Sequence, residues 1–220
     1  MPSYLSHIIH QQHFVLSSER VVYWENEKTL ILADLHIGKS GHFRKAGIGI
    51  PQTVYQDDLH RLVSQLLFFK AEKLLIVGDL SHSRANRELD LFHKWRRDFS
   101  SLEVHLARGN HDVLDEAWYK QANIRVHETG LRLGAFSFAH DPVDCFDDGS
   151  YYFSGHLHPA ITVRGKARQS LRFPCFCFGP QQAILPAFSR FTGSYNVVPA
   201  KGEKVFAIVE KDIICFEGKC

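Results

Sequence analysis

The stretch Thr29-Leu30-Ile31-Leu32-Ala33-Asp34-Leu35-His36 runs from a short apolar segment directly into a carboxylate and an imidazole. Two later stretches repeat this arrangement: Leu75-Ile76-Val77 ends in Gly78-Asp79, and Leu106-Ala107 leads into Arg108-Gly109-Asn110-His111-Asp112. Apolar runs of this length, bounded by glycine and polar residues, are typical of buried strands. Polar groups that follow such strands gather at the carboxyl edge of an α/β sheet, where ligands bind. The sequence therefore predicts an α/β sheet with a ligand site at this edge.

Strands and helices alternate in the first half of the chain, and strands dominate the second half. The expected strands are Phe14–Leu16, Val21–Trp24, Thr29–Ala33, Lys73–Val77, Glu103–Ala107, Phe136–Ala139 and Tyr151–Ser154. Apolar residues at helical spacing predict helices from Pro51 to about Lys70 and from about Asn86 to Phe99. A short third helix is expected from Val113, with Asp112 as its N-cap.

The composition limits the class of protein. The 220 residues are 45% hydrophobic and contain no repeat, low-complexity segment or long linker, so we expect a single domain over residues 1–220. A net charge of +2 is too small to indicate a nucleic-acid-binding protein by itself. The five cysteines form no CxxC pair, which favours reduced thiols and a cytoplasmic location. No export signal or membrane-spanning segment is visible.

Two further polar blocks follow expected strands in the second half. His140 comes after Phe136–Ala139, and Gly155-His156-Leu157-His158 comes after Tyr151–Ser154. Residues two apart in extended backbone point to the same side, so we expect His156 and His158 to reach a common metal, and likewise the pair in Asp34-Leu35-His36. Mixed carboxylate, amide and imidazole ligands suit divalent Mn, Fe or Zn, and ligand type alone does not choose among these metals.

Glycine precedes three of the polar groups, at Gly78, Gly109 and Gly155. A residue without a Cβ lets the backbone turn sharply, so we expect these glycines to direct the following side chain inward.

Together the blocks resemble the binuclear metallophosphoesterase (calcineurin-like) superfamily, whose pattern is DxH, GD, GNH(D/E), H and GHxH. The resemblance implies a four-layer α-β-β-α sandwich with two mixed β-sheets flanked by helices. It also implies two divalent metal ions, which we expect to be Mn, with Fe or Zn as alternatives. The first metal is assigned to Asp34, His36 and His158, the second to Asn110, His140 and His156, and the Asp79 carboxylate bridges both. A hydroxide between cations roughly 3.5–4 Å apart would then attack the phosphoester.

His111 follows Asn110 but is not a ligand in the family pattern. The resemblance makes it the candidate proton donor or hydrogen-bond donor to the leaving-group oxygen. Asp112 would either orient His111 or cap the following helix, and capping is the expectation because Asp commonly starts helices. His82, in Gly78-Asp79-Leu80-Ser81-His82, is expected to lie beside the ligands or to face the substrate.

Motifs outside the metal blocks resemble one bacterial branch of the superfamily, the ligase-associated DNA-damage-response endonuclease of the PdeM type. These motifs are Ala33-Asp34-Leu35-His36-Ile37-Gly38-Lys39, Phe43-Arg44-Lys45-Ala46-Gly47-Ile48 with Pro51, Leu185-Pro186-Ala187-Phe188 and Phe191-Thr192-Gly193. The resemblance implies a phosphodiesterase or endonuclease that acts on nucleic acid, DNA or RNA, in bacterial DNA repair. It also implies a functional association with a DNA ligase and a helicase.

Two basic segments are candidates for substrate binding. Gly38 to Pro51 carries Lys39 and Arg44, and Arg44 is the stronger candidate because a guanidinium binds phosphate bidentately. An ordinary solvated loop explains the segment equally well. The second segment contains Arg164, Lys166, Arg168 and Arg172, and a solvated face is favoured there over a nucleic-acid track.

Two other functions stay open. A phosphatase or a cyclic-nucleotide phosphodiesterase would use the same metal centre, because that centre recognises phosphate rather than its substituents. A non-catalytic scaffold of a repair complex is the third alternative, and it would be expected to have lost metal ligands. None of the family's ligand positions is substituted here.

Overall fold

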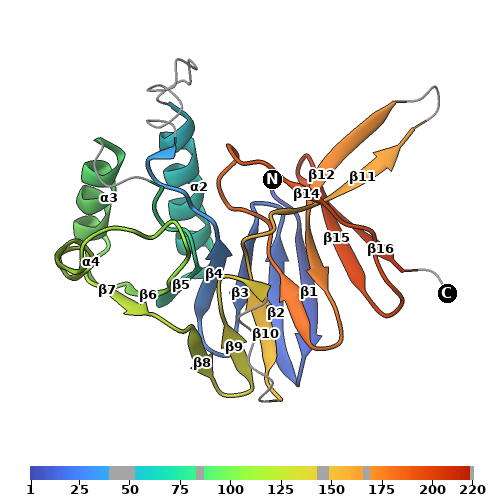
Figure 1. Ribbon diagram of the computed structural model, residues 1–220, viewed down its shortest axis with the longest axis horizontal. Helices are drawn as coiled ribbons and strands as arrows, with labels where there is room; N and C mark the ends of the chain where they lie inside the picture. The colour runs from blue at the N-terminus through green and yellow to red at the C-terminus, as the bar shows by residue number, and fades with distance from the viewer. Residues whose placement is uncertain (40–52, 83–86, 143–148, 166–168, 219–220) are drawn as a thin grey trace.

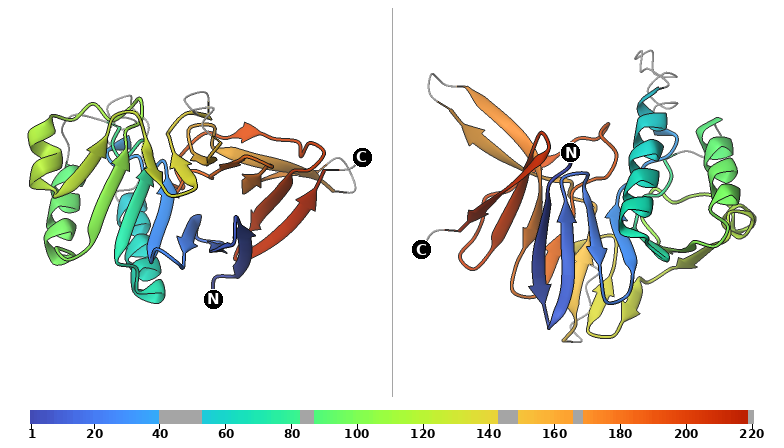
Figure 2. Two further views of the ribbon diagram at one scale, coloured as in Figure 1. Left: turned by 90° about the horizontal axis from the view of Figure 1, so that it is seen from below. Right: turned by 180° about the vertical axis from the view of Figure 1, so that it is seen from behind.

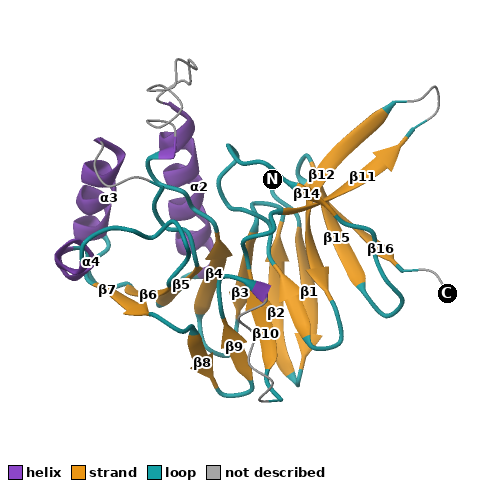
Figure 3. Ribbon diagram, in the orientation of Figure 1, coloured by secondary structure: helices purple, strands orange, loops and turns teal. Residues whose placement is uncertain are grey.

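Two mixed β-sheets pack face to face, and helices lie on the outer face of the first sheet (Figure 1). The computed structural model describes residues 1–39, 53–82, 87–142, 149–165 and 169–218. The arrangement confirms the predicted α/β metallophosphoesterase sandwich of two mixed sheets. All three described α-helices precede residue 122 and cover the first sheet, so the helical layer expected on the second sheet is not found among the described residues. Figure 3 shows the same division: the three labelled helices lie on one side, and strands and loops make up most of the second half of the chain.

The first sheet has seven strands in the order in which they occur along the chain. They are β1 (Tyr4–Ile9), β2 (Gln12–Ser17), β3 (Val21–Trp24), β4 (Thr29–Ala33), β5 (Lys73–Val77), β6 (Glu103–Ala107) and β7 (Ile124–His127). The pairs from β1 to β4 are antiparallel, and those from β4 to β7 are parallel. Because β4 to β6 are parallel neighbours, their carboxyl ends lie at one edge of the sheet, as the sequence predicted.

Helices α2 (Thr53–Phe69), α3 (Arg87–Asp98) and α4 (Glu116–Gln121) cover one face of this sheet (Figure 2). Leu62 and Leu66 of α2 and Phe92 of α3 are buried against it, which agrees with the helical spacing of the apolar residues. The third helix begins at Glu116 with Asp115 as its N-cap, so the predicted start at Val113 with Asp112 as cap was wrong. None of the described helices is both long and apolar enough to cross a lipid bilayer.

The second sheet has nine strands and confirms the β-rich second half. They are β8 (Leu131–Leu133), β9 (Phe136–Phe138), β10 (Tyr151–Ser154), β11 (Pro159–Arg164), β12 (Ser170–Phe178), β13 (Gln182–Ile184), β14 (Tyr195–Asn196), β15 (Lys204–Val209) and β16 (Asp212–Glu217). Strand β10 runs parallel to β9 and β13, its two neighbours. The ends of β9 and β10 therefore point in one direction, and both carry candidate ligands.

Aromatic side chains fill the space between the two sheets. Phe14 and Trp24 of the first sheet contact Phe136 of the second, with ring centroids 5.2 and 5.0 Å apart. All three are at most 3% exposed, and burial of one such ring stabilises the fold by roughly 1.5–3 kcal/mol. This core fixes the sheets against each other, so that strand ends from both meet at one place.

Candidate metal centre

Seven side chains that the sequence predicted as ligands come together where the ends of the two sheets meet. The first sheet supplies Asp34 and His36 after β4, Asp79 after β5 and Asn110 after β6, and the second supplies His140 after β9 and His156 and His158 after β10. Residues up to 124 positions apart in the sequence thus share one site.

Three of these residues form a first group: Asp34, His36 and His158. One ligand atom from each lies within 4.8 Å of the others. The His36 Nε2 and His158 Nε2 atoms are 3.3 Å apart, and His158 Nε2 is 3.5 Å from Asp34 Oδ1. This is the set that the family resemblance gave to the first metal.

A second group gathers around His140. Asp34, Asp79 and His140 offer ligand atoms within 4.8 Å of one another. The His140 Nε2 atom lies 2.9 Å from Asn110 Oδ1, 3.1 Å from His156 Nδ1 and 3.5 Å from Asp79 Oδ1. The other Asp79 oxygen is 3.9 Å from His36 Nδ1, so this carboxylate spans the two groups as a bridging ligand must.

The donor atoms fit divalent cations. Within the described part of the chain, Asp34 Oδ1, His36 Nδ1 and His140 Nδ1 are buried and have no hydrogen-bond partner. Burying such an atom unsatisfied costs several kcal/mol, and a cation would remove that cost for Asp34 Oδ1. An imidazole binds one cation through one nitrogen, so a cation held by the two Nε2 atoms would leave the Nδ1 atoms as they are. Burial, with a smaller contribution from Lys39, lowers the pKa of His36 to about 2, so its imidazole is neutral as metal ligation requires. Burial also raises the pKa of Asp79, an effect that a bound cation would oppose.

The backbone at the ligands is unusual. Five of the seven have positive φ: Asp34 (57°), His36 (52°), Asp79 (46°), His156 (63°) and His158 (47°). The expectation that extended backbone aligns the paired ligands was therefore wrong, because β4 ends at Ala33 and left-handed residues turn both side chains inward. Backbone hydrogen bonds hold this conformation, from Asp34 N to Gly78 O and from His36 N to Asp79 O. Left-handed conformations at non-glycine residues cost about 1–3 kcal/mol each and cluster at functional sites.

The three glycines are needed mainly because other ligands approach them closely. A Cβ on Gly78 would lie 1.9 Å from His140 Nδ1, one on Gly109 2.3 Å from Asp79 Oδ1, and one on Gly155 2.6 Å from Asp34 Oδ2. Gly78 also has a φ of +76°, so the predicted sharp turn applies to it. Each glycine thus makes room for a ligand from another loop.

Asp112 has a role different from helix capping. Its buried carboxylate accepts hydrogen bonds from Ser81 N and Gly109 N, each at 2.9 Å, and so ties the loop after β5 to the loop after β6. Burial raises the pKa of Asp112 to about 7. Asp112 is not a helix cap, because its carboxylate accepts hydrogen bonds from these two backbone amides and not from the amides at the start of α4.

His111 and His82 lie beside the candidate ligands. The His111 backbone N–H donates to Asp79 Oδ1 at 3.0 Å, and the residue is exposed. The His111 ring is 4.5 Å from the His82 ring and 6.0 Å from the His36 ring, centroid to centroid. Two imidazoles outside the predicted ligand set therefore border the site.

Lys39 is half-buried near the two carboxylates. Burial lowers the pKa of Lys39, and Asp34 and Asp79 act in the opposite direction. Its ammonium group thus lies within electrostatic reach of the site. Arg44, the other predicted phosphate-binding residue, lies outside the described residues.

The sequence did not indicate a supporting segment at residues 185–194. Phe188 N donates to Ala33 O at 2.7 Å and Ser189 N to Asp34 O at 3.2 Å, so this segment runs beside the end of β4. The Gly193 carbonyl lies 3.2 Å from His158 Nδ1, which leaves Nε2 to face Asp34 and His36. Motifs in this segment contributed to the branch resemblance, but nothing in them pointed to a contact with His158.

Comparison with known proteins defines the class. Residues 27–172 match the family model described as calcineurin-like phosphoesterase. The Pseudomonas putida nuclease MPE has 30% sequence identity over 94% of this chain and 97% of its own, with a TM-score of 0.80. A phosphoesterase from E. coli, YfcE, has 12% identity over 87% of this chain and 99% of its own, with a TM-score of only 0.43. No curated protein matches the sequence.

The fold and the site define a metal-dependent phosphoesterase, a hydrolase of phosphoric esters. The chain belongs to the calcineurin-like phosphoesterase family, whose members bind two divalent metal ions. The similarity to the nuclease MPE also supports the branch that the sequence motifs predicted.

Proposed function

We propose that the protein hydrolyses phosphodiester bonds in nucleic acid, using Mn²⁺. The observation that carries the proposal is the pair of ligand groups, which the buried carboxylates of Asp34 and Asp79 connect. The 30% sequence identity to a nuclease supports nucleic acid as the substrate. Two bound cations would activate water and neutralise charge on the phosphoryl oxygens.

The protein's own residues have distinct tasks in this proposal. Asp34 and Asp79 supply the negative charge that holds the cations, and the remaining ligands complete the site. His111, on the exposed side, donates a proton from its ring to the leaving-group oxygen. Asp112 keeps the loop that carries His111 in place through Gly109 N and Ser81 N. Lys39 and Arg44 would contact substrate phosphates, and His82 would face the substrate from beside His111.

The cellular role rests on the branch resemblance. We place the enzyme in bacterial DNA repair, in functional association with a DNA ligase and a helicase. A cytoplasmic location agrees with Cys175, Cys177 and Cys215, which are free thiols in the structure. A phosphatase or a cyclic-nucleotide phosphodiesterase remains the competing activity. A scaffold without activity is disfavoured because the donor atoms converge as a working site requires.

The test compares wild-type protein and Asp79→Ala with added Mn²⁺ on a phosphodiester dye, a phosphomonoester dye and supercoiled plasmid. We expect wild-type protein to cleave the diester and the plasmid, and Asp79→Ala to cleave neither. Cleavage of the monoester alone would exclude the nuclease. Parallel assays with Mg²⁺, Fe²⁺ and Zn²⁺ test which metal ion the protein uses. Higher activity with one of these ions than with Mn²⁺ would contradict the assignment of Mn²⁺.

A further inference from the structure

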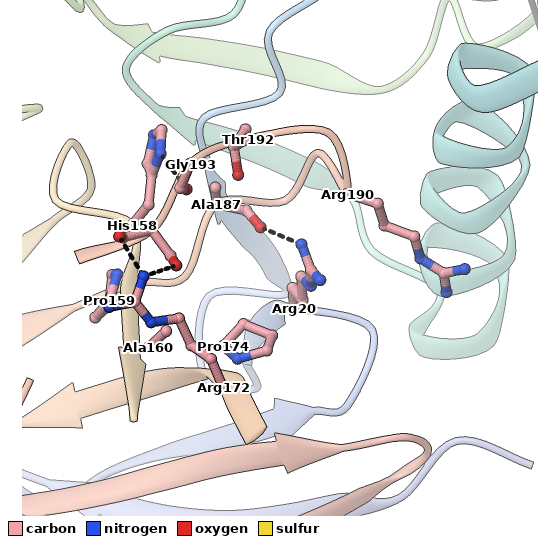
Figure 4. A pocket seen from close by; sticks show the side chains of 11 residues that line it. Arg20, His158, Pro159, Ala160, Arg172, Pro174, Ala187, Arg190, Thr192 and Gly193 are labelled. Carbon is pink, nitrogen blue, oxygen red and sulfur yellow. Dashed lines mark hydrogen bonds between the residues drawn. The ribbon is translucent and has the colours of Figure 1, made fainter. Parts of the chain in front are cut away.

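Three arginines surround a pocket beside His158. The pocket has a volume of about 160 Å³ and is lined by Arg20, Arg172 and Arg190 together with the segment 187–194. Figure 4 shows Arg20 and Arg172 beside the pocket, and the Arg190 side chain extending from its edge toward α2. No carboxylate is among its described lining residues. A cavity with this lining is suited to an anion.

Hydrogen bonds fix two of these arginines to the segment that supports His158. Arg20 Nη1 donates to Ala187 O at 3.1 Å and to Ser189 O at 3.0 Å. Arg172 Nη1 donates to Ser194 O at 3.2 Å and to Ser194 Oγ at 3.3 Å. Because Gly193 of the same segment contacts His158 Nδ1, the pocket is held at a defined position relative to the metal centre.

Positive charge exceeds negative charge around the pocket. Glu19 lies 3.7 Å from Arg61 and 3.4 Å from Arg190, and Asp58 lies 2.9 Å from Arg61. With Arg20 and Arg172, four guanidinium groups stand against these two carboxylates. Burial first, and then the positive charges of Arg61 and Arg190, lower the pKa of Arg20 to about 10, while Asp58 and Glu19 act in the opposite direction.

A second cavity continues the pocket away from His158. It has a volume of about 400 Å³ and shares Arg20, Pro174 and Arg190 with the first. Arg61 and Lys211 also line it, together with the carboxylates of Glu19 and Glu210, so its cationic side chains outnumber its carboxylates by four to two. We call the two cavities the arginine groove. Guanidinium groups bind phosphate oxygens bidentately, and a row of them follows a chain of phosphates better than one isolated phosphate.

We propose that the arginine groove binds the phosphates of a single nucleic-acid strand on one side of the bond that is cut. The inference rests on the proposed nuclease function and makes it more specific. A monoester or a cyclic nucleotide has only the reacting phosphate and would not reach the groove. The groove therefore gives a physical reason for selecting a polymer over a small ester.

The test is the double variant Arg172→Gln/Arg190→Gln, with Arg97→Gln as a matched control. Arg97 is an exposed arginine on α3, which α2 separates from the second sheet (Figure 1). Arg20 is left unchanged because it is largely buried and bonds to Ala187 and Ser189, whereas the bonds of Arg172 to Ser194 are exposed. The metal-loaded proteins are assayed on a single-stranded oligonucleotide and on a phosphodiester dye over a range of salt concentrations.

We expect the double variant to lose about 10- to 100-fold in kcat/KM on the oligonucleotide and clearly less on the dye. The slope of log KM against log salt concentration should fall by about 0.7 for each arginine removed. Arg97→Gln should match wild type on both substrates.

Three outcomes would overturn the proposal that the arginine groove binds a nucleic-acid strand. The first is a double variant with unchanged kcat/KM and salt slope on the oligonucleotide; the nuclease function would still stand. The second is an equal loss on dye and oligonucleotide, which would mean that the arginines act only by positioning His158. The third is a wild-type protein that cleaves the dye but neither oligonucleotide nor plasmid. This result would exclude both the nuclease function and the proposed role of the groove.

Discussion

Two groups of histidines in the molecule differ in what their nitrogen atoms face. His36 and His140 lie beside buried Asp34 and Asp79, and their Nδ1 atoms have no hydrogen-bond partner among the described residues. His105 on β6 is also close to another histidine, its Nδ1 lying 2.9 Å from His127 Nε2 on β7. The other His105 nitrogen, however, lies 3.1 Å from Glu103 Oε1.

The comparison shows what separates a metal centre from a structural histidine pair. Short distances between imidazoles occur in both places. Only the first combines them with two fully buried carboxylates and with donor atoms that the protein itself leaves unsatisfied.

Asp79→Ala should lower kcat on a phosphodiester dye by about 10³-fold or more. The carboxylate spans the two ligand groups, and losing several kcal/mol of transition-state stabilisation corresponds to a factor of this size. Metal content, measured by plasma mass spectrometry, should fall with the activity. His105→Ala is the control and should keep both its metal and its turnover. If His105→Ala also lost metal, His105 and His127 could not be treated as a structural pair separate from the metal centre.

Gly78→Ala should destabilise the protein by about 3 kcal/mol and weaken metal binding, because its Cβ would meet the His140 ring at 1.9 Å. Gly134→Ala is a matched control: its φ is also positive, at +60°, but nothing lies within 4 Å of the added Cβ. Gly134→Ala should cost only about 1 kcal/mol and leave metal affinity unchanged. Urea unfolding and metal titration measure the two effects. Equal results for the two variants would mean that backbone strain, and not contact with His140, makes Gly78 necessary.

His111→Ala should keep its metals and lose about 10²-fold in kcat on diesters with poor leaving groups. A proton donor matters less when the leaving group is already acidic, so the loss on an activated dye should be smaller. The measurement is kcat for a series of aryl and alkyl phosphodiesters. A loss that is constant along the series would assign His111 to substrate positioning instead.

The strands and the ligand types were predictable because their signals are local. Strands β3 to β6 and β10 have the bounds expected from the sequence, since each is a short apolar run ended by polar or glycine residues. Strand β1 was not predicted. Its alternation in Tyr4–Ile9 is weak, and it is a strand because it pairs with β2 along its whole length.

The local geometry of the site was not predictable in the same way. The positive φ at Asp34 and His36 depends on hydrogen bonds to the loop after β5, more than 40 positions later in the chain. The sequence indicates Asp112 as a helix cap, whereas its carboxylate accepts a hydrogen bond from Ser81 N, 31 positions earlier in the chain. The contact of Gly193 with His158 and the grouping of Arg20 with Arg172 and Arg190 join segments that only the packed sheets bring together.

The pair His105 and His127 should make the metal-free protein less stable as the pH falls. Burial is the main cause that lowers the pKa of both side chains. Below the ordinary histidine pKa of about 6.5, the unfolded chain therefore binds more protons than the folded chain, and the free energy of unfolding decreases. With metal chelated, wild type and His105→Gln/His127→Gln share every titrating group except these two. The double variant should thus lose less stability than wild type between about pH 7 and pH 5 in urea titrations. Identical losses would show that the pair binds protons equally well when folded and unfolded, and that its nitrogens are not held neutral by the fold.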